Sequence, residues 1–157
     1  MGNTKELPKR KSTRLAAYDY SRPGAYFVTV CTAGRRCILW DAEAGVLSPA
    51  GKIVESAICD ISLHYPCFSV DKYVVMPNHI HMLLTIRPDA DGRMISAPTL
   101  SVMVGQMKRW ASRQAGCSLW QKSFHEHVVR GETDYREIWR YIDDNPAAWA
   151  QDRYYEA

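Results

Sequence analysis

The sequence lacks several features that would place the protein in a membrane, outside the cell or among zinc proteins. No apolar run approaches the ~20 residues that a membrane-spanning helix needs, and the N-terminal end lacks the apolar core of a signal peptide. The five cysteines form no Cys-x-x-Cys pair, and their odd number does not suggest a disulfide framework. These absences predict a cytoplasmic protein with reduced thiols and no membrane contact.

A glycine-rich phosphate loop is also missing, and strands do not alternate with helices as they do in a parallel sheet. No internal repeat or linker divides the 157 residues, a length that suits one domain with a sizeable core. Residues 1–20 are expected to form a basic, flexible arm, and residues 21–157 to form the folded domain.

Hydrophobic periodicity and turn residues predict the order of the elements. Strands are expected at 26–32, 37–40, 68–76, 79–86 and 124–129, and helices at 49–63, 99–114 and 133–144. Ser48 should cap the first helix and Thr133 the last, and residues 37–40 should return as a hairpin beside 26–32. The order ββαββαβα predicts an α+β domain with helices packed on an antiparallel sheet.

Two histidines separated by one apolar residue stand out at the start of a predicted strand. Residues two apart in a strand point to the same face, so His79 and His81 should converge while Ile80 and Met82 enter the core. Two imidazoles at this spacing can share one divalent cation. The same pattern also arises when histidines are simply packed against their neighbours.

A second alternating pair, His125 and His127, has charged Glu126 between its members. An apolar residue at that position would indicate a strand with its other face buried, and Glu126 does not. We therefore expect this pair to support the site or the structure rather than to hold the metal.

The last predicted helix places Ile138, Tyr141, Ile142 and Asn145 on one face. An amphipathic helix turns such a face toward the sheet, so a phenol and an amide one turn apart should project from the packed side. A core tyrosine with its hydroxyl at the rim, followed by a C-capping asparagine, would give the same pattern.

Several motifs together resemble one transposase family. Residues 76–81 (MPNHIH), followed by MLL at 82–84, resemble the histidine–hydrophobic–histidine metal motif of HUH single-strand transposases. Residues 10–15 (RKSTRL), 18–20 (YDY) and 23–29 (PGAYFVT) resemble the start of the REP-associated tyrosine transposases. Residues 124–130 (FHEHVVR) and 141–146 (YIDDNP) resemble their end. The resemblance extends from about Arg10 to Tyr155 and implies the ferredoxin-like HUH fold.

The resemblance implies roles for four residues. His79 and His81 would bind a divalent metal, Mg²⁺ or Mn²⁺, and Tyr141 would be the nucleophile. Asn145 matches a polar residue that supplies a third ligand in related enzymes, some of which carry glutamine there.

The implied reaction fits these residue types. A tyrosine hydroxyl has a pKa of about 10 and is a weak nucleophile at neutral pH, whereas a metal with neutral ligands can strongly polarise a phosphate oxygen. Tyr141 would attack single-stranded DNA beside a repeat-derived hairpin, leaving a 5′-phosphotyrosine and a free 3′-hydroxyl. Tyr135, Tyr154 and Tyr155 have neither a polar partner one turn on nor a matching motif.

Basic residues are candidates for contacts with the DNA backbone, and the net charge of +3 is compatible with a polyanionic partner. The candidates are Arg10, Lys11, Arg14, Arg35, Arg36, Lys108, Arg109 and Arg113. A solvated tail and ordinary surface charge would account for them too. The expected partner is single-stranded or hairpin DNA, and the expected state is a monomer, with a dimer as the alternative.

Two other classes of function stay open. A domesticated, catalytically silent protein would keep the fold and bind DNA hairpins without turnover. A ferredoxin-like RNA-binding module would carry stacking aromatic residues on an exposed sheet face, where this sequence has histidines.

Overall fold

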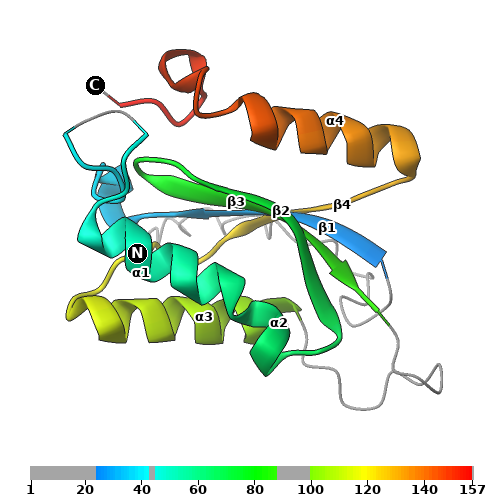
Figure 1. Cartoon of the computed structure of the whole chain (residues 1–157), viewed down its shortest axis with the longest axis horizontal. Helices are drawn as coiled ribbons and strands as arrows, with labels where there is room; N and C mark the ends of the chain where they lie inside the picture. The colour runs from blue at the N-terminus through cyan, green and yellow to red at the C-terminus, as the bar shows by residue number, and fades with distance from the viewer. Residues whose placement is uncertain (1–23, 43–44, 88–99, 157) are drawn as a thin grey trace, which may run out of the picture.

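The computed structural model describes residues 24–42, 45–87 and 100–156, and it shows helices on both faces of a four-stranded antiparallel sheet (Figure 1). The strands are β1 (Gly24–Cys31), β2 (Phe68–Val75), β3 (His79–Ile86) and β4 (His125–Val128), in the spatial order β2-β3-β1-β4. The helices are α1 (Pro49–Cys59), α2 (Ile61–His64), α3 (Leu100–Ala115) and α4 (Glu132–Asp144), and short 3-10 turns span Ala33–Arg35 and Trp149–Gln151. This arrangement confirms the predicted α+β class.

The central strand β3 separates two apolar layers. Its even-numbered residues from Ile80 to Ile86 lie in the main core, which α1 and α3 cover. On the opposite face Leu83 packs against Ile138 and Ile142 of α4. His79 and His81 share that face with Leu83 because side chains alternate along a strand. The fold therefore turns both histidines toward α4.

The second strand predicted at 37–40 is wrong. Gly34 and Arg35 have positive φ angles of 63° and 53°, which turn the chain away from β1. Leu39 then donates its N–H to the carbonyl of Pro77 at 3.0 Å, in the turn between β2 and β3. Both edges of β1 already pair, with β3 and with β4, so no edge is open for a hairpin.

The helix predicted over 49–63 is divided in two. It begins as expected, with Ser48 Oγ accepting the N–H of Gly51 at 3.1 Å. The first helix ends at Cys59, and the short α2 follows after Asp60, whose backbone angles are −85° and −6°.

The last helix begins earlier than predicted. Gly131, with φ of 98°, precedes the first helical residue, so Thr133 lies inside the helix and does not cap it. Asp134 instead accepts the backbone N–H of Arg130 at 2.9 Å. The left-handed backbone of Gly131, which other residues rarely adopt, sets the start of α4.

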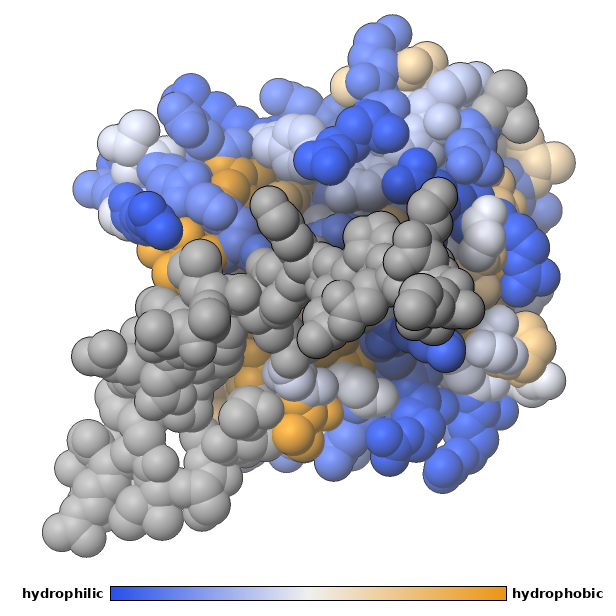
Figure 2. Space-filling view, turned by 180° about the vertical axis from the view of Figure 1, so that it is seen from behind, coloured by the Kyte–Doolittle hydropathy of each residue, from blue (hydrophilic) through white to orange (hydrophobic). Residues whose placement is uncertain are grey.

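Some predictions fall outside the described residues, namely the basic arm at 1–20 and nearly all of the loop between β3 and α3. Among the residues that are described, no helix has the length and apolar character that a membrane crossing requires. All five cysteines are free thiols. Seen from behind, hydrophilic residues dominate the visible surface, and apolar residues show in small patches (Figure 2).

Two glycine-to-alanine changes should have opposite effects on stability. A Cβ at Gly51 would overlap the backbone oxygen of Leu39, whereas a Cβ at Gly105, inside α3, would meet nothing within 4 Å. Gly51→Ala should lower the free energy of unfolding by about 1–3 kcal/mol, and Gly105→Ala should raise it by about 0.5–1 kcal/mol. Urea unfolding of both variants measures this. Equal shifts in the same direction would contradict the packing of α1 against the loop before it.

Candidate active site

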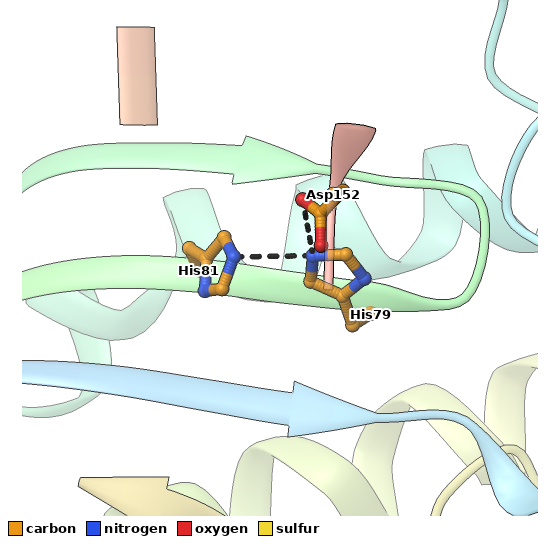
Figure 3. Close-up of side chains that lie close together, drawn as sticks. All are labelled: His79, His81 and Asp152. Carbon is orange, nitrogen blue, oxygen red and sulfur yellow. Dashed lines mark hydrogen bonds and ion pairs between the residues drawn. The ribbon is translucent and has the colours of Figure 1, made fainter. Parts of the chain in front are cut away.

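The two histidines at the start of β3 meet through their Nε2 atoms, which lie 3.1 Å apart (Figure 3). Both side chains are buried. The tight turn before them closes through the N–H of Met76, which donates to the carbonyl of His79 at 2.8 Å. The turn and the strand geometry together place both rings on the α4 side of the sheet.

Hydrogen bonds of Asn78 fix the proton on His79. The Asn78 Nδ2 donates to the carbonyls of Tyr154 at 2.8 Å and Arg35 at 3.4 Å, so its Oδ1 is the acceptor on the other side. That Oδ1 lies 2.8 Å from the His79 Nδ1, which must donate to it. In the neutral ring, the lone pair of His79 then lies on Nε2 and faces His81.

The ring of His81 is held by Thr29, whose Oγ1 lies 2.8 Å from the His81 Nδ1. When this Nδ1 donates to Thr29, the His81 Nε2 also turns a lone pair toward His79. Burial, reinforced by Arg35, lowers the pKa of His79 to about 3. Burial has the largest effect on the pKa of His81 and lowers it well below its ordinary value. The charges of His79 and Arg153 lower it further. Both rings are therefore neutral near pH 7, as metal ligands must be.

A carboxylate completes the cluster from beyond the end of α4. The Oδ2 of Asp152 lies 3.8 Å from the His79 Nε2 (Figure 3) and is buried with no hydrogen-bond partner among the described residues. The ligand atoms of His79, His81 and Asp152 lie within 4.8 Å of one another. A buried carboxylate oxygen without a partner is costly, and a divalent cation held by two nitrogens and this oxygen would satisfy it.

Sequence reasoning missed Asp152. The residue lies in an irregular segment after Asn145 and Pro146, where no periodicity or motif spacing relates it to the histidines. Only the folded chain brings the segment back over β3, so the sequence carried no local signal for this ligand.

Tyr141 lies beside the cluster and reaches solvent. Its ring centroid is 5.3 Å from that of His81, and 41% of the residue is exposed. Burial, and then the charge of Asp152, raises the pKa of Tyr141, while Asn145 and Arg153 act in the opposite direction. The phenol is therefore protonated near neutral pH.

Asn145, one turn after Tyr141, is buried. Its Nδ2 makes no hydrogen bond of standard geometry to any described residue. The amide is nevertheless close enough to Tyr141 to favour the ionised phenol. The structure thus brings together all four residues that the resemblance implied, and it adds Asp152.

A cleft of about 470 Å³ opens between β4 and α4, and its lining includes His81, Tyr141, Arg153 and Tyr154. His125 and His127 line it too and are exposed. The Nε2 of His127 lies 2.8 Å from the Oδ2 of Asp134. The second histidine pair therefore borders the cleft beside Tyr141 and is not part of the three-residue cluster.

A second hollow, of about 390 Å³, lies on the opposite face of the molecule among α1, α2 and α3. Its lining includes Ile61, His64, Met107 and Trp110. Among the described residues that line it, no three His, Cys, Asp or Glu side chains come as close together as His79, His81 and Asp152 do. The chemistry of the side chains therefore favours the cleft.

The described basic residues that were predicted to contact DNA are not gathered in one place. Lys108, Arg109 and Arg113 belong to α3, so the sheet separates them from the histidines. Lys108 Nζ donates to the carbonyl of Gln121 at 2.6 Å, and burial lowers the pKa of its ammonium group. From this position, the three residues can contact only a part of the DNA that lies outside the cleft.

Among the predicted basic residues that the structure describes, Arg35 is the one whose charge acts on His79. Its guanidinium carbon lies 5.6 Å from the ring centroid of Tyr154. Arg36 follows it in the turn after β1 and donates through its Nε to the carbonyl of Ala33 at 3.2 Å. Arg10, Lys11 and Arg14 lie outside the described residues.

Asp152→Asn should weaken metal binding, because the change removes the one anionic ligand while keeping its size. We expect the affinity for Mn²⁺, measured by isothermal titration calorimetry, to fall about 10–100-fold. His64→Ala, which alters an exposed histidine on α2, should leave the affinity unchanged. Wild-type affinity in Asp152→Asn would show that this carboxylate does not hold the metal.

Sequence comparisons find similar proteins in bacteria. No model of a protein family matches the chain. An uncharacterized protein of Haemophilus influenzae is 28% identical over 167 aligned residues, which cover 93% of each chain. A protein of Escherichia coli K12 named REP-associated tyrosine transposase is 29% identical over 128 residues, which cover 81% of this chain and 68% of the relative.

A comparison with solved structures also finds transposases. A REP-associated tyrosine transposase bound to a REP hairpin matches with a TM-score of 0.65 and 27% identity, over 85% of this chain and 73% of that one. A candidate transposase from Deinococcus radiodurans R1 shares the fold, with a TM-score of 0.52 and 19% identity over 83% and 95% of the two chains. In sequence and in fold, the protein is thus a relative of the REP-associated tyrosine transposases.

Proposed function

We propose that the protein nicks and rejoins DNA in a metal-dependent reaction in which Tyr141 is the nucleophile. The observation that carries this proposal is the position of Tyr141, half-exposed in a cleft with its ring 5.3 Å from that of His81 in a buried His-His-Asp cluster. A related transposase was solved with a REP hairpin bound. This relative supports hairpin DNA as the substrate, and we place the nick in a single-stranded flank of the hairpin, as the sequence resemblance implies.

His79, His81 and Asp152 would hold Mg²⁺ or Mn²⁺, which would polarise a phosphodiester oxygen and offset the charge of the transition state. The oxygen of Asp152 makes the donor set more suitable for these ions than two histidines alone. Asn78 and Thr29 keep the two rings in the orientation that ligation needs.

Tyr141 would carry out the covalent step. Its hydroxyl oxygen forms a bond to phosphorus while the bond from phosphorus to the 3′ oxygen breaks. The phenol loses its proton to solvent and the departing 3′ oxygen gains one, so the products are a 5′-phosphotyrosine and a 3′-hydroxyl. One phosphate ester replaces another, and attack by a 3′-hydroxyl on the phosphotyrosine can therefore rejoin the strand without an energy source.

Asn145 is assigned to the same step. Its side chain favours the ionised form of Tyr141, and its amide oxygen is proposed as a further ligand. Because the amide is buried one turn after the nucleophile, it can act on Tyr141 without blocking the cleft.

The structure does not favour the RNA-binding alternative. Such a module needs an open sheet face on which bases can stack. In the described part of the chain, α4 covers one face, and α1 and α3 cover the other (Figure 1). The histidines lie under this cover and not on an open platform.

Tyr141→Phe should abolish a covalent adduct between protein and DNA. The assay uses end-labelled DNA hairpins with single-stranded flanks, taken from palindromic repeats of the source genome, with Mn²⁺ and a denaturing gel. The variant loses only the attacking oxygen. Tyr155→Phe, at an exposed tyrosine outside the cleft, is the matched control and should form the adduct at the wild-type rate.

Two other outcomes of this assay would contradict the proposal. Cleavage that survives Tyr141→Phe would mean that water or another tyrosine attacks the DNA. Tight hairpin binding by the wild-type protein with no adduct in either metal would favour the catalytically silent hairpin-binding protein.

A further inference from the structure

Arg153 has a distinctive position in the cleft between β4 and α4. Among the described residues that line this cleft, it is the one side chain with a permanent positive charge. The lining also contains carboxylates, including those of Asp134 and Glu137, and its other basic side chains are histidines, which carry no permanent charge. In the part of the chain that the structure describes, a DNA strand that enters the cleft therefore meets a fixed cation only at Arg153.

The backbone of the C-terminal segment directs Arg153 into the cleft. Asp152 has φ of −68° and ψ of 140°, and Arg153 and Tyr154 follow it in a turn in which the N–H of Tyr155 donates to the carbonyl of Asp152 at 3.0 Å. The side chain of Asp152 is 1% exposed and Tyr154 is buried, so both point into the molecule. Arg153 lies between them and is exposed on the cleft side.

The guanidinium of Arg153 is held near the nucleophile and is not paired with an acid. It lies 5.1 Å from the ring centroid of Tyr154, which itself packs 4.6 Å from the ring of His79. No carboxylate of the described chain forms a salt bridge with it. Its charge acts on Tyr141, so the guanidinium is within electrostatic reach of the phenol.

Charges in the cleft are arranged along α4. Asp134 lies in the first turn of the helix and Glu137 one turn further, whereas Tyr141 lies near its end. The two carboxylates that α4 contributes therefore lie toward its first turns, whereas Tyr141 near its end lines the cleft together with His81 and Arg153. One phosphate is drawn to the Tyr141 end, while the strand beyond it is repelled from the Asp134 end.

We propose that Arg153 binds the phosphate group that Tyr141 attacks. A guanidinium is always charged and presents a rigid fork of donors that matches two phosphate oxygens. In that position it would also stabilise the charge that develops on those oxygens during attack. The inference rests on the proposed function and adds the residue that holds the reacting group.

The first test measures binding without chemistry. In the Tyr141→Phe protein with Mn²⁺, fluorescence anisotropy follows a short fluorescein-labelled single-stranded DNA. Adding Arg153→Ala should weaken binding on the order of tenfold and reduce the slope of log affinity against log salt by about 0.7, the value for one lost phosphate contact. Arg87→Ala removes an exposed arginine just past the other end of β3 and should change neither quantity.

A scan of neutral methylphosphonates along the same DNA identifies the phosphate. At one position, a methylphosphonate should weaken binding to the Tyr141→Phe protein but should have no further effect when Arg153 is also replaced by alanine. Equal losses at that position in both proteins would overturn the proposal. So would an Arg153→Ala protein that behaves like Arg87→Ala, or one that loses affinity for Mn²⁺, since Arg153 would then act only through Asp152.

The cleavage assay separates this inference from the proposed function. With Tyr141 present, Arg153→Ala should slow adduct formation at saturating DNA by about 10²–10³-fold, and the adduct should form at the phosphate that the scan identifies. If that phosphate is found but the wild-type protein forms no adduct, the phosphate site stands and the nicking proposal fails. If the adduct forms but no phosphate depends on Arg153, only the phosphate site fails.

Discussion

The candidate site depends on one buried amide. The side chain of Asn78 accepts a hydrogen bond from His79 on one side and donates to the carbonyl of Tyr154 on the other. It therefore sets the tautomer of a proposed ligand and also ties the segment after α4 to the start of β3. That segment carries Asp152, so the same amide that orients the first ligand helps to place the third. Because the group is buried, its hydrogen bonds are costly to lose.

Sequence periodicity alone was enough to predict part of this site. The period of a strand places His79 and His81 on one face, and the period of a helix places Tyr141 and Asn145 one turn apart. Neither rule reaches Asp152, whose position depends on how an irregular segment folds back across the sheet. The strand expected at 37–40 failed for a related reason, since its residues had strand character but both edges of β1 were taken by distant strands.

Charge was harder to interpret than periodicity. A lysine or arginine on a predicted helix shows which face it occupies but not which layer of the molecule that face belongs to. Lys108 illustrates this, because it stabilises the loop before β4 by donating to a carbonyl on the side of the sheet away from the histidines. Arg153, which no pattern singled out, lies in the cleft. Which basic side chains reach the cleft is thus set by tertiary contacts more than by local composition.

The three proposed ligands lie far apart in the sequence, so a shared ion would link distant parts of the chain. His79 and His81 come from the middle of the chain and Asp152 from near its end, so an ion bound by all three closes a loop that contains α3, β4 and α4. Such an ion acts as a reversible cross-link. The unfolded chain must close this long loop before it can use all three ligands, and it loses entropy in doing so. The ion therefore binds the folded chain preferentially and holds α4, with its tyrosine, against the sheet.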